Sequence, residues 1–214
     1  MAFVNMNRNV KIIALRKAVA FTLFLLGFTF LISQPVQAQF QKHANIWYFG
    51  NGAGLDFNNG TLTVLTNGAM DAFEGTATIA DAQGNLLFYS DGKTVWNKQH
   101  QVMSLGTGLM GSDNSAQSCL IVQNPGKPHI YYIFTTDAIG NPNDLRYSTI
   151  DMSRADGLGQ VTEKNTLLYT PTSEKLTAVL HKNKRDAWVV SHQHGTNTFR
   201  SFLVTAEGVN LTSN

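Results

Sequence analysis

The sequence has little cysteine and little charge. Cys119 is the only cysteine in 214 residues, so an internal disulfide framework is excluded. It lies in the apolar run AQSCLIV, which predicts a buried, inert thiol. Of the 16 basic and 14 acidic residues, four basic and no acidic ones fall within positions 1–38, which leaves 12 against 14 afterwards. A net charge of −2 with no basic cluster predicts no nucleic-acid partner.

An apolar run near the N-terminus is typical of a secretory signal peptide. Residues 18–32 read AVAFTLFLLGFTFLI, four basic residues precede them, and Pro-Val-Gln-Ala at 35–38 follows. The run is shorter than the roughly 20 residues that span a bilayer. We predict a signal peptide at 1–38, cleaved between Ala38 and Gln39. The remaining chain is then secreted or held at the cell surface, with no membrane span.

Residues 39–214 show short apolar or alternating runs between turn residues, a pattern typical of β-strands. Three blocks repeat one order of strand, polar turn and aromatic-rich strand. They read GTATIA-DAQGN-LLFYSDG, AQSCLIV-QNPGKPH-IYYIFTTDA and KLTAVL-HKNKRD-AWVVSHQHG. Third strands are predicted at 94–97, 145–152 and 198–205, and a fourth at 165–170. The segments 45–50, 53–57 and 61–65 fit strands two to four of one more unit.

The spacing of these units predicts an all-β fold of β-propeller-like blades, each with four antiparallel strands. The second-strand residues Trp47, Leu87, Tyr131 and Trp188 lie 40, 44 and 57 residues apart, close to the period of propeller blades. Three to four blades make an incomplete ring, so we expect the propeller-like domain at 39–214 to be truncated at its C-terminal end. A jelly roll or an immunoglobulin-type sandwich is the structural alternative.

Several phrases together resemble one group of proteins. They are NIWYFGNGAGLDFNNG, LLFYSDGKTVWNKQHQVM, GTGLMGS, IYYIFTTDA, LRYSTIDM, and EKLTAVLH with WVVSHQHGTNTF. The set resembles the N-terminal region of large secreted Bacteroidetes proteins that are often labelled as gliding-motility-associated or as carrying a type B sorting domain for type IX secretion. The resemblance implies a propeller-like region followed by further domains of a longer chain. It brings no catalytic residues.

The stretch SDGKTVW at 90–96 resembles the Asp box of sialidase-like propellers, S-x-D-x-G-x-T-W. Ser90 and Asp91 are adjacent, whereas the Asp box separates them by one residue. The aligned blocks also place the stretch between the second and third strands instead of the third and fourth. We therefore predict a structural hairpin in which Gly92 supplies a permissive backbone, Ser90 and Asp91 cap the turn, and Trp96 packs between blades.

Loops after second strands and loops between blades are expected at one end of a propeller, where ligands usually bind. Their acidic and imidazole side chains form a candidate ligand face: Asp71, Glu74, Asp91, Asp113, Asp137, Glu174, His192 and His194. Such groups can bind a cation or act as acid and base. Asp is also an ordinary turn residue that hydrogen-bonds local backbone, which is the structural alternative.

The remaining patterns favour structural roles. His192 and His194 would share one face of a strand, but no third metal ligand is identifiable. The glycines at 50, 52 and 54 lack dinucleotide-binding spacing and predict a turn. Trp47, Trp96 and Trp188 are expected to pack between blades. No metal, cofactor or catalytic residue is predicted.

Two classes of function follow from these patterns. The first is a non-catalytic binding, adhesion or scaffold module of a larger extracellular protein, associated with gliding motility. Its partner would be a polysaccharide, an extracellular protein or another domain of its own chain. The alternative is a glycan-acting hydrolase on a sialidase-like propeller, motivated by the Asp-box likeness and the acidic loops.

Overall fold

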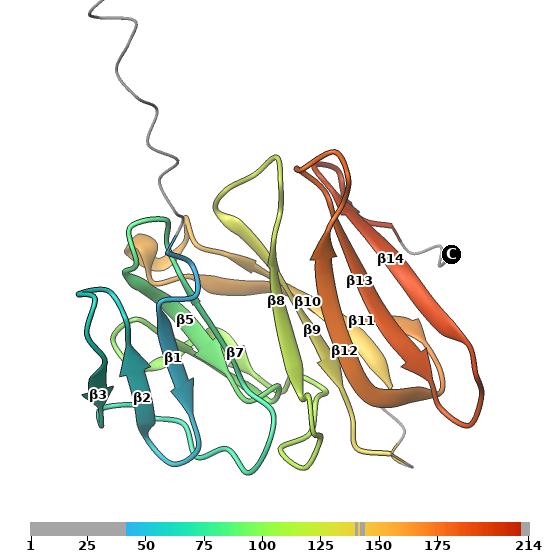
Figure 1. Cartoon of the computed structure of the whole chain (residues 1–214), viewed down its shortest axis with the longest axis horizontal. Coiled ribbons are helices and arrows are strands. Elements are labelled where there is room, and N and C mark those ends of the chain that lie inside the picture. The colour runs from blue at the N-terminus through green and yellow to red at the C-terminus, as the bar shows by residue number, and fades with distance from the viewer. Residues whose placement is uncertain (1–41, 140, 142–143, 211–214) are drawn as a thin grey trace, which may run out of the picture. The chain divides into compact units, whose positions relative to one another are not determined.

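A computed structural model describes residues 42–139, 141 and 144–210 (Figure 1). The predicted signal peptide and its cleavage site between Ala38 and Gln39 lie outside the described residues. The described part is all-β, as the sequence predicts, with one short 3-10 helix, η1 (Ala155–Gly157). Within it, no helix has the length and hydropathy needed to cross a membrane.

The strands form three sheets (Figure 1). The first sheet has the order β1-β2-β3: β1 (Ile46–Phe49), β2 (Ala53–Asp56) and β3 (Thr63–Leu65). The middle sheet has the order β4-β5-β6-β7-β11-β10-β9-β8: β4 (Ala77–Ala80), β5 (Leu86–Ser90), β6 (Thr94–Asn97), β7 (Val102–Thr107), β8 (Cys119–Gln123), β9 (Ile130–Thr136), β10 (Leu145–Asp151) and β11 (Gln160–Tyr169). The last sheet has the order β12-β13-β14-β15: β12 (Thr172–Leu180), β13 (Ala187–Gln193), β14 (Phe199–Thr205) and β15 (Gly208–Val209).

The middle sheet consists of two antiparallel halves, β4–β7 and β8–β11. Consecutive strands pair within each half, and the halves meet where β7 and β11 run parallel at the pair Ser104–Gln160. The last sheet is likewise an antiparallel run of four consecutive strands. Short turns connect such neighbours, as antiparallel pairing allows. The first strands of the three runs, β4, β8 and β12, contact one another in that order.

The strands predicted from the sequence match those of the structure, with two omissions. The third strands expected at 94–97, 145–152 and 198–205 are β6, β10 and β14, and the fourth expected at 165–170 is the second part of β11. Strands β7 and β15 were not predicted. Their sequences, VMSLGT and GV, are too short or too glycine-containing to show an apolar alternation.

One type of turn recurs at the ends of β2, β6, β10 and β14. A side-chain oxygen accepts the backbone N–H two residues further on. The acceptor-to-donor pairs are Asp56 with Asn58 at 2.8 Å, Asn97 with Gln99 at 2.8 Å, Asp151 with Ser153 at 2.9 Å, and Thr205 with Glu207 at 3.3 Å. Asp and Asn favour turns because they can replace a backbone acceptor in this way.

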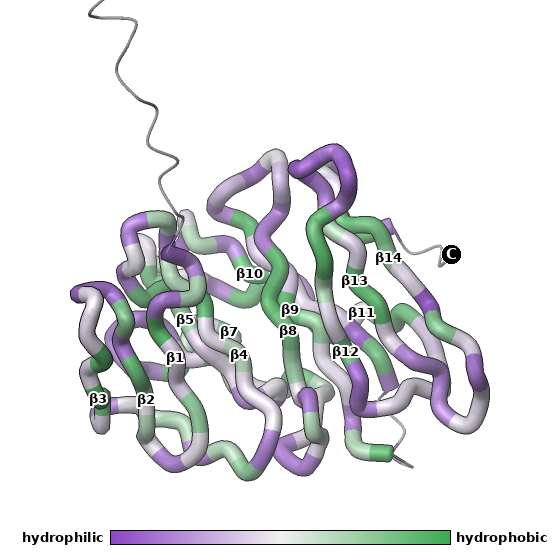
Figure 2. Tube along the Cα trace, in the orientation of Figure 1, coloured by the Kyte–Doolittle hydropathy of each residue, from purple (hydrophilic) through white to green (hydrophobic). Residues whose placement is uncertain are grey.

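Side chains of alternating residues fill the space between neighbouring sheets, and Figure 2 shows apolar stretches along strands with polar residues gathered at turns. Between the first sheet and the β4–β7 half, Tyr48 stacks on Tyr89 with ring centroids 4.7 Å apart. Between the two halves, Phe88 meets Tyr131 edge to face at 5.5 Å. Each aromatic pair contributes about 0.5–1.5 kcal/mol beyond its buried area. The third core, between the β8–β11 half and the last sheet, includes Val122, Tyr132, Phe134, Tyr169, Val189, Phe202 and Val204.

Cys119 provides a reporter of unfolding. Its side chain is 3% exposed, and burial raises the pKa of the thiol to about 12, well above that of a free cysteine. Because the thiolate is the reactive form, we expect Ellman's reagent at about pH 8 to label the native chain only as fast as it unfolds. Labelling rates with and without urea test this expectation. Immediate stoichiometric labelling without denaturant would contradict it.

Candidate functional site

The Asp-box-like stretch forms the hairpin between β5 and β6. Ser90 Oγ accepts the Gly92 N–H at 2.9 Å and donates to the Thr94 carbonyl at 2.7 Å. Asp91 Oδ1 accepts the N–H groups of Lys93 and Thr94 at 2.8 and 2.7 Å. Gly92 has φ +87°, which favours glycine. The Asp91 side chain is therefore occupied by the backbone of its own turn.

Gly92 also lets this hairpin approach the loop between β7 and β8 closely, because a side chain at this position would collide with Ser118. The Ser118 hydroxyl donates to the Asp91 carbonyl and lies where a Cβ on Gly92 would be. The Gly111 N–H donates to the Gly92 carbonyl at 3.0 Å. Trp96, at the far side of the hairpin, stacks on Tyr89 with centroids 5.7 Å apart. One end of the stretch therefore packs against the loop between β7 and β8, and its other end, at Trp96, packs in the core beside the first sheet.

Hydrogen bonds connect several loops of the candidate ligand face, and the carboxylates of these loops make different contacts. Asp113 pairs with Lys93 at 2.9 Å, and this contact lowers the pKa of Asp113 and raises that of Lys93. Asp137 is buried and accepts the Ala138 N–H at 2.8 Å. Asp71 and Glu74 are exposed, and the backbone of Asp71 forms a bridge with Asn51.

Glu174 ties the last sheet to two loops of the middle sheet. Its Oε2 accepts the Ala116 N–H and its Oε1 accepts the Ile139 N–H, both at 3.0 Å. These two N–H groups lower the pKa of Glu174 because they stabilise the carboxylate. A side chain that binds two separate loops at once acts as a structural clamp.

The structure places His192 in β13 and His194 in the turn after it, and the two do not form a metal site with their neighbours. His192 Nε2 contacts the Thr196 carbonyl at 2.7 Å, and its ring packs on Phe199 with centroids 5.0 Å apart. His194 is exposed, and its backbone N–H donates to the Pro171 carbonyl. In the part of the chain that the structure describes, no group of three His, Cys, Asp or Glu side chains is placed to hold a metal ion.

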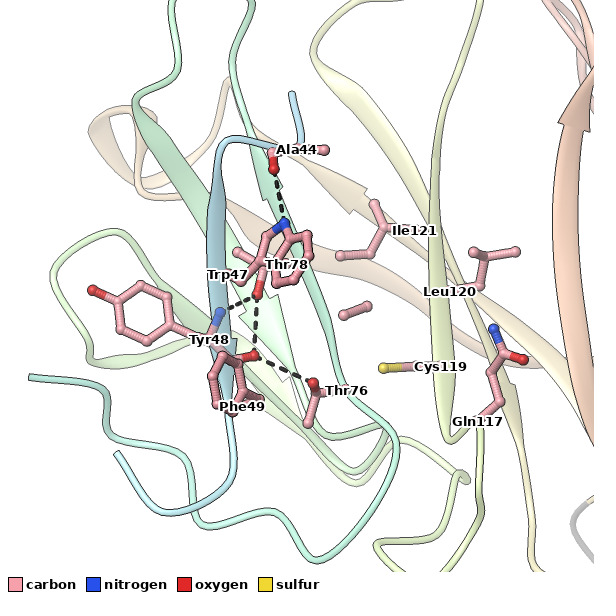
Figure 3. Close-up of a pocket in the computed structure, with 11 residues that line it drawn as sticks. Ala44, Trp47, Tyr48, Phe49, Thr76, Thr78, Gln117, Cys119, Leu120 and Ile121 are labelled. Atoms are coloured by element: carbon pink, nitrogen blue, oxygen red, sulfur yellow. Dashed lines mark hydrogen bonds between the residues drawn. The ribbon is translucent and has the colours of Figure 1, made fainter. Parts of the chain in front are cut away.

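A groove between β1 and β8, with β4 as its floor, is the candidate binding site (Figure 3). It has a volume of about 370 Å³. The lining residues are Ala44, Trp47, Tyr48, Phe49, Thr76, Ala77, Thr78, Gln117, Cys119, Leu120 and Ile121. Sequence patterns did not identify this groove because its walls come from three strands that are distant in sequence.

Hydrogen bonds to β1 fix the aromatic wall of the groove (Figure 3). The Tyr48 N–H donates to Thr78 Oγ1 at 2.9 Å, and Thr76 Oγ1 donates to the Tyr48 carbonyl at 3.2 Å. The Trp47 indole N–H donates to the Ala44 carbonyl at 2.8 Å. Trp47 was expected to pack between sheets, but its side chain is 49% exposed. A fixed, open indole beside threonine and glutamine side chains can stack on a ligand and hydrogen-bond its edges.

Comparisons with protein-family models, with curated proteins and with solved structures found no match. The assignment of a function therefore depends on the residues and geometry of this chain.

Two substitutions at Asp91 separate a turn role from a catalytic one. Asp91→Asn keeps an oxygen that accepts both backbone N–H groups, so we expect the free energy of unfolding to stay close to that of the wild type. Asp91→Ala leaves these groups without their partner and should lower it by about 1–2 kcal/mol. Urea denaturation measures both values. Equal losses for the two variants would contradict the turn role.

The clamp at Glu174 predicts a similar contrast. Glu174→Ala removes the acceptor of two loop N–H groups and should lower the free energy of unfolding by about 1–2 kcal/mol. Glu74→Ala is the matched control, because Glu74 is exposed in a neighbouring loop and should change stability little. Urea denaturation compares the two variants, and hydrogen exchange at Ala116 and Ile139 locates the effect. Unchanged exchange at both amides in Glu174→Ala would argue against the clamp.

Proposed function

We propose that this chain is a non-catalytic extracellular binding or scaffold module built of β-propeller-like blades. Three runs of four consecutive antiparallel strands support the blade interpretation, as do the recurring turns at the ends of their third strands. The contacts of β4 with β8 and of β8 with β12 support an arrangement as neighbouring blades around an axis. The first sheet corresponds to strands two to four of a further blade.

The observation that carries the binding role is the groove of Figure 3 with its exposed Trp47. We propose a polysaccharide as its ligand, since indole faces stack on sugar rings and hydroxyl and amide groups bond sugar hydroxyls. The loop carboxylates that motivated the hydrolase alternative support a structural role, because Asp91 and Glu174 each accept two backbone N–H groups.

The setting of the module is part of the same proposal. The predicted signal peptide supports export, and the resemblance to gliding-motility-associated proteins supports a place at the N-terminal side of a larger surface protein. Further domains of that chain, or another extracellular protein, would then be its partners beside the polysaccharide.

A glycan array beside a set of fluorogenic glycosides tests this function. Trp47→Ala should weaken binding to the recognised glycan about tenfold, which corresponds to about 1.4 kcal/mol of stacking. Phe73→Ala is the matched control, because Phe73 is an exposed aromatic residue outside the groove and should leave binding unchanged. Equal affinity of Trp47→Ala and wild type would contradict the site. Glycoside hydrolysis lost in Asp91→Asn would favour the enzyme instead.

A further inference from the structure

The turns of the first sheet contain three asparagines that are each followed by glycine. The pairs are Asn51-Gly52, Asn59-Gly60 and Asn67-Gly68. The side chain of an asparagine in such a pair can react with the next backbone amide, because glycine has no Cβ that keeps the two groups apart. The three pairs share this local sequence, so differences in their reactivity arise from the structure around them.

Backbone contacts hold the first pair, Asn51-Gly52, between β1 and β2. The Gly52 N–H donates to the Met70 carbonyl at 2.8 Å, and Asn51 forms an antiparallel bridge with Asp71. The amide nitrogen that would attack the Asn51 side chain is therefore already engaged. Turning this nitrogen toward the side chain requires the hydrogen bond to Met70 to break.

The third pair, Asn67-Gly68, follows β3 and is held through both its side chain and its backbone. The Tyr48 hydroxyl donates to Asn67 Oδ1 at 2.9 Å, and Asn67 Nδ2 contacts His100 Nε2 at 2.9 Å. The Gly68 N–H donates to the Gly52 carbonyl at 3.1 Å. A reaction between the side chain and this amide requires both groups to leave these partners.

The second pair, Asn59-Gly60, lies in the turn between β2 and β3 and lacks these restraints. Both residues are exposed, Gly60 has φ +73°, and a Cβ built on Gly60 would meet no atom within 4 Å. Among the residues that the structure describes, neither the Asn59 side chain nor the Gly60 N–H has a hydrogen-bond partner. The anchored residue of this turn is Asn58, whose side-chain amide donates to the Gly84 carbonyl at 2.9 Å.

We propose that Asn59 is a site of spontaneous deamidation, whereas hydrogen bonds protect Asn51 and Asn67. The Gly60 nitrogen attacks Asn59 Cγ, the new N–Cγ bond closes a succinimide ring, and the Cγ–Nδ2 bond breaks. The Gly60 nitrogen loses its proton, and Nδ2 leaves as ammonia. A water molecule then adds to either ring carbonyl and opens the ring to aspartate or isoaspartate, with no oxidation or reduction.

Either product places a new carboxylate in a turn close to the groove of Figure 3. The turn follows Phe57, whose ring contacts that of Trp47 with centroids 5.2 Å apart. Isoaspartate also lengthens the backbone by a methylene group, because the chain then runs through the former side chain. Conversion of Asn59 therefore changes charge and backbone geometry near the aromatic wall of the groove.

Peptide mapping of the full chain tests the proposal. The protein is incubated in mildly alkaline buffer, native and in urea, and digested with chymotrypsin, which cuts after Phe57 and Leu62 and so separates the three pairs. Mass spectrometry of the native sample should show conversion of Asn59 about tenfold faster than that of Asn51 or Asn67, a barrier difference of about 1.4 kcal/mol. In urea the three rates should approach one another, because the pairs share their local sequence.

Tyr48→Phe tests the protection itself. This change removes the hydroxyl that donates to Asn67 Oδ1 and keeps the ring that stacks on Tyr89. Conversion of Asn67 should rise about fivefold, and that of Asn59 should stay unchanged. Asn59→Asp is the control, since it already carries a product side chain and should give no further conversion in its peptide. Circular dichroism establishes that each variant is folded.

Three results would overturn the proposal. The first is a native chain in which Asn51 or Asn67 converts as fast as Asn59. The second is a native chain whose Asn59 stays intact while the chain in urea reacts. The third is an unchanged rate at Asn67 in folded Tyr48→Phe, which would show that hydrogen bonds do not protect this residue.

Discussion

A side-chain oxygen that accepts a backbone N–H two residues further on is the contact on which the short strands of this chain depend. Hairpins of this length are marginal unless their turns fix the register. The contact is made after β2, β6, β10 and β14 by Asp56, Asn97, Asp151 and Thr205, and after β4 by Asp81. Each bond contributes only about 1 kcal/mol. The bond also provides an acceptor for a turn N–H group that has no partner on a neighbouring strand. The sheets can therefore pack together without burying backbone N–H groups that lack a hydrogen bond.

Backbone N–H groups also decide how Glu174 is interpreted, although its donors lie far from it in the sequence. The N–H groups of Ala116 and Ile139 lower the pKa of Glu174 because they stabilise the carboxylate, and its lone pairs are directed at the backbone. Such a group is poorly suited to take up or deliver a proton to a substrate. The Asp-box likeness of residues 90–96 has the same origin, since a serine, an aspartate and a glycine are what a tight turn at the end of a strand requires.

The all-β character and most strands could be predicted from the sequence because those features depend on local alternation and turn residues. Strand β7 was not predicted because apolar and polar residues alternate only weakly in its segment, which also contains Gly106. Strand β15 was not predicted because two residues are too few to show a period. The groove at Trp47 did not follow from the repeat. That groove depends on how β1 lies against β4 and β8. The distance between sheets cannot be predicted from the alternation of apolar and polar residues. The exposure of Trp47 was missed for the same reason: an alternating aromatic looks identical whether or not a further sheet covers it.

A stack of sheets behaves like a repeat array, in which each unit contacts only its neighbours and the two end units determine solubility. End units of such arrays usually have a polar outer side. Here the outward sides of the first and last sheets, at Trp47 and at Trp188, keep the apolar character of the internal interfaces. Retaining apolar rows on both end faces costs solubility in an isolated chain. Such exposed apolar rows favour contact with another surface.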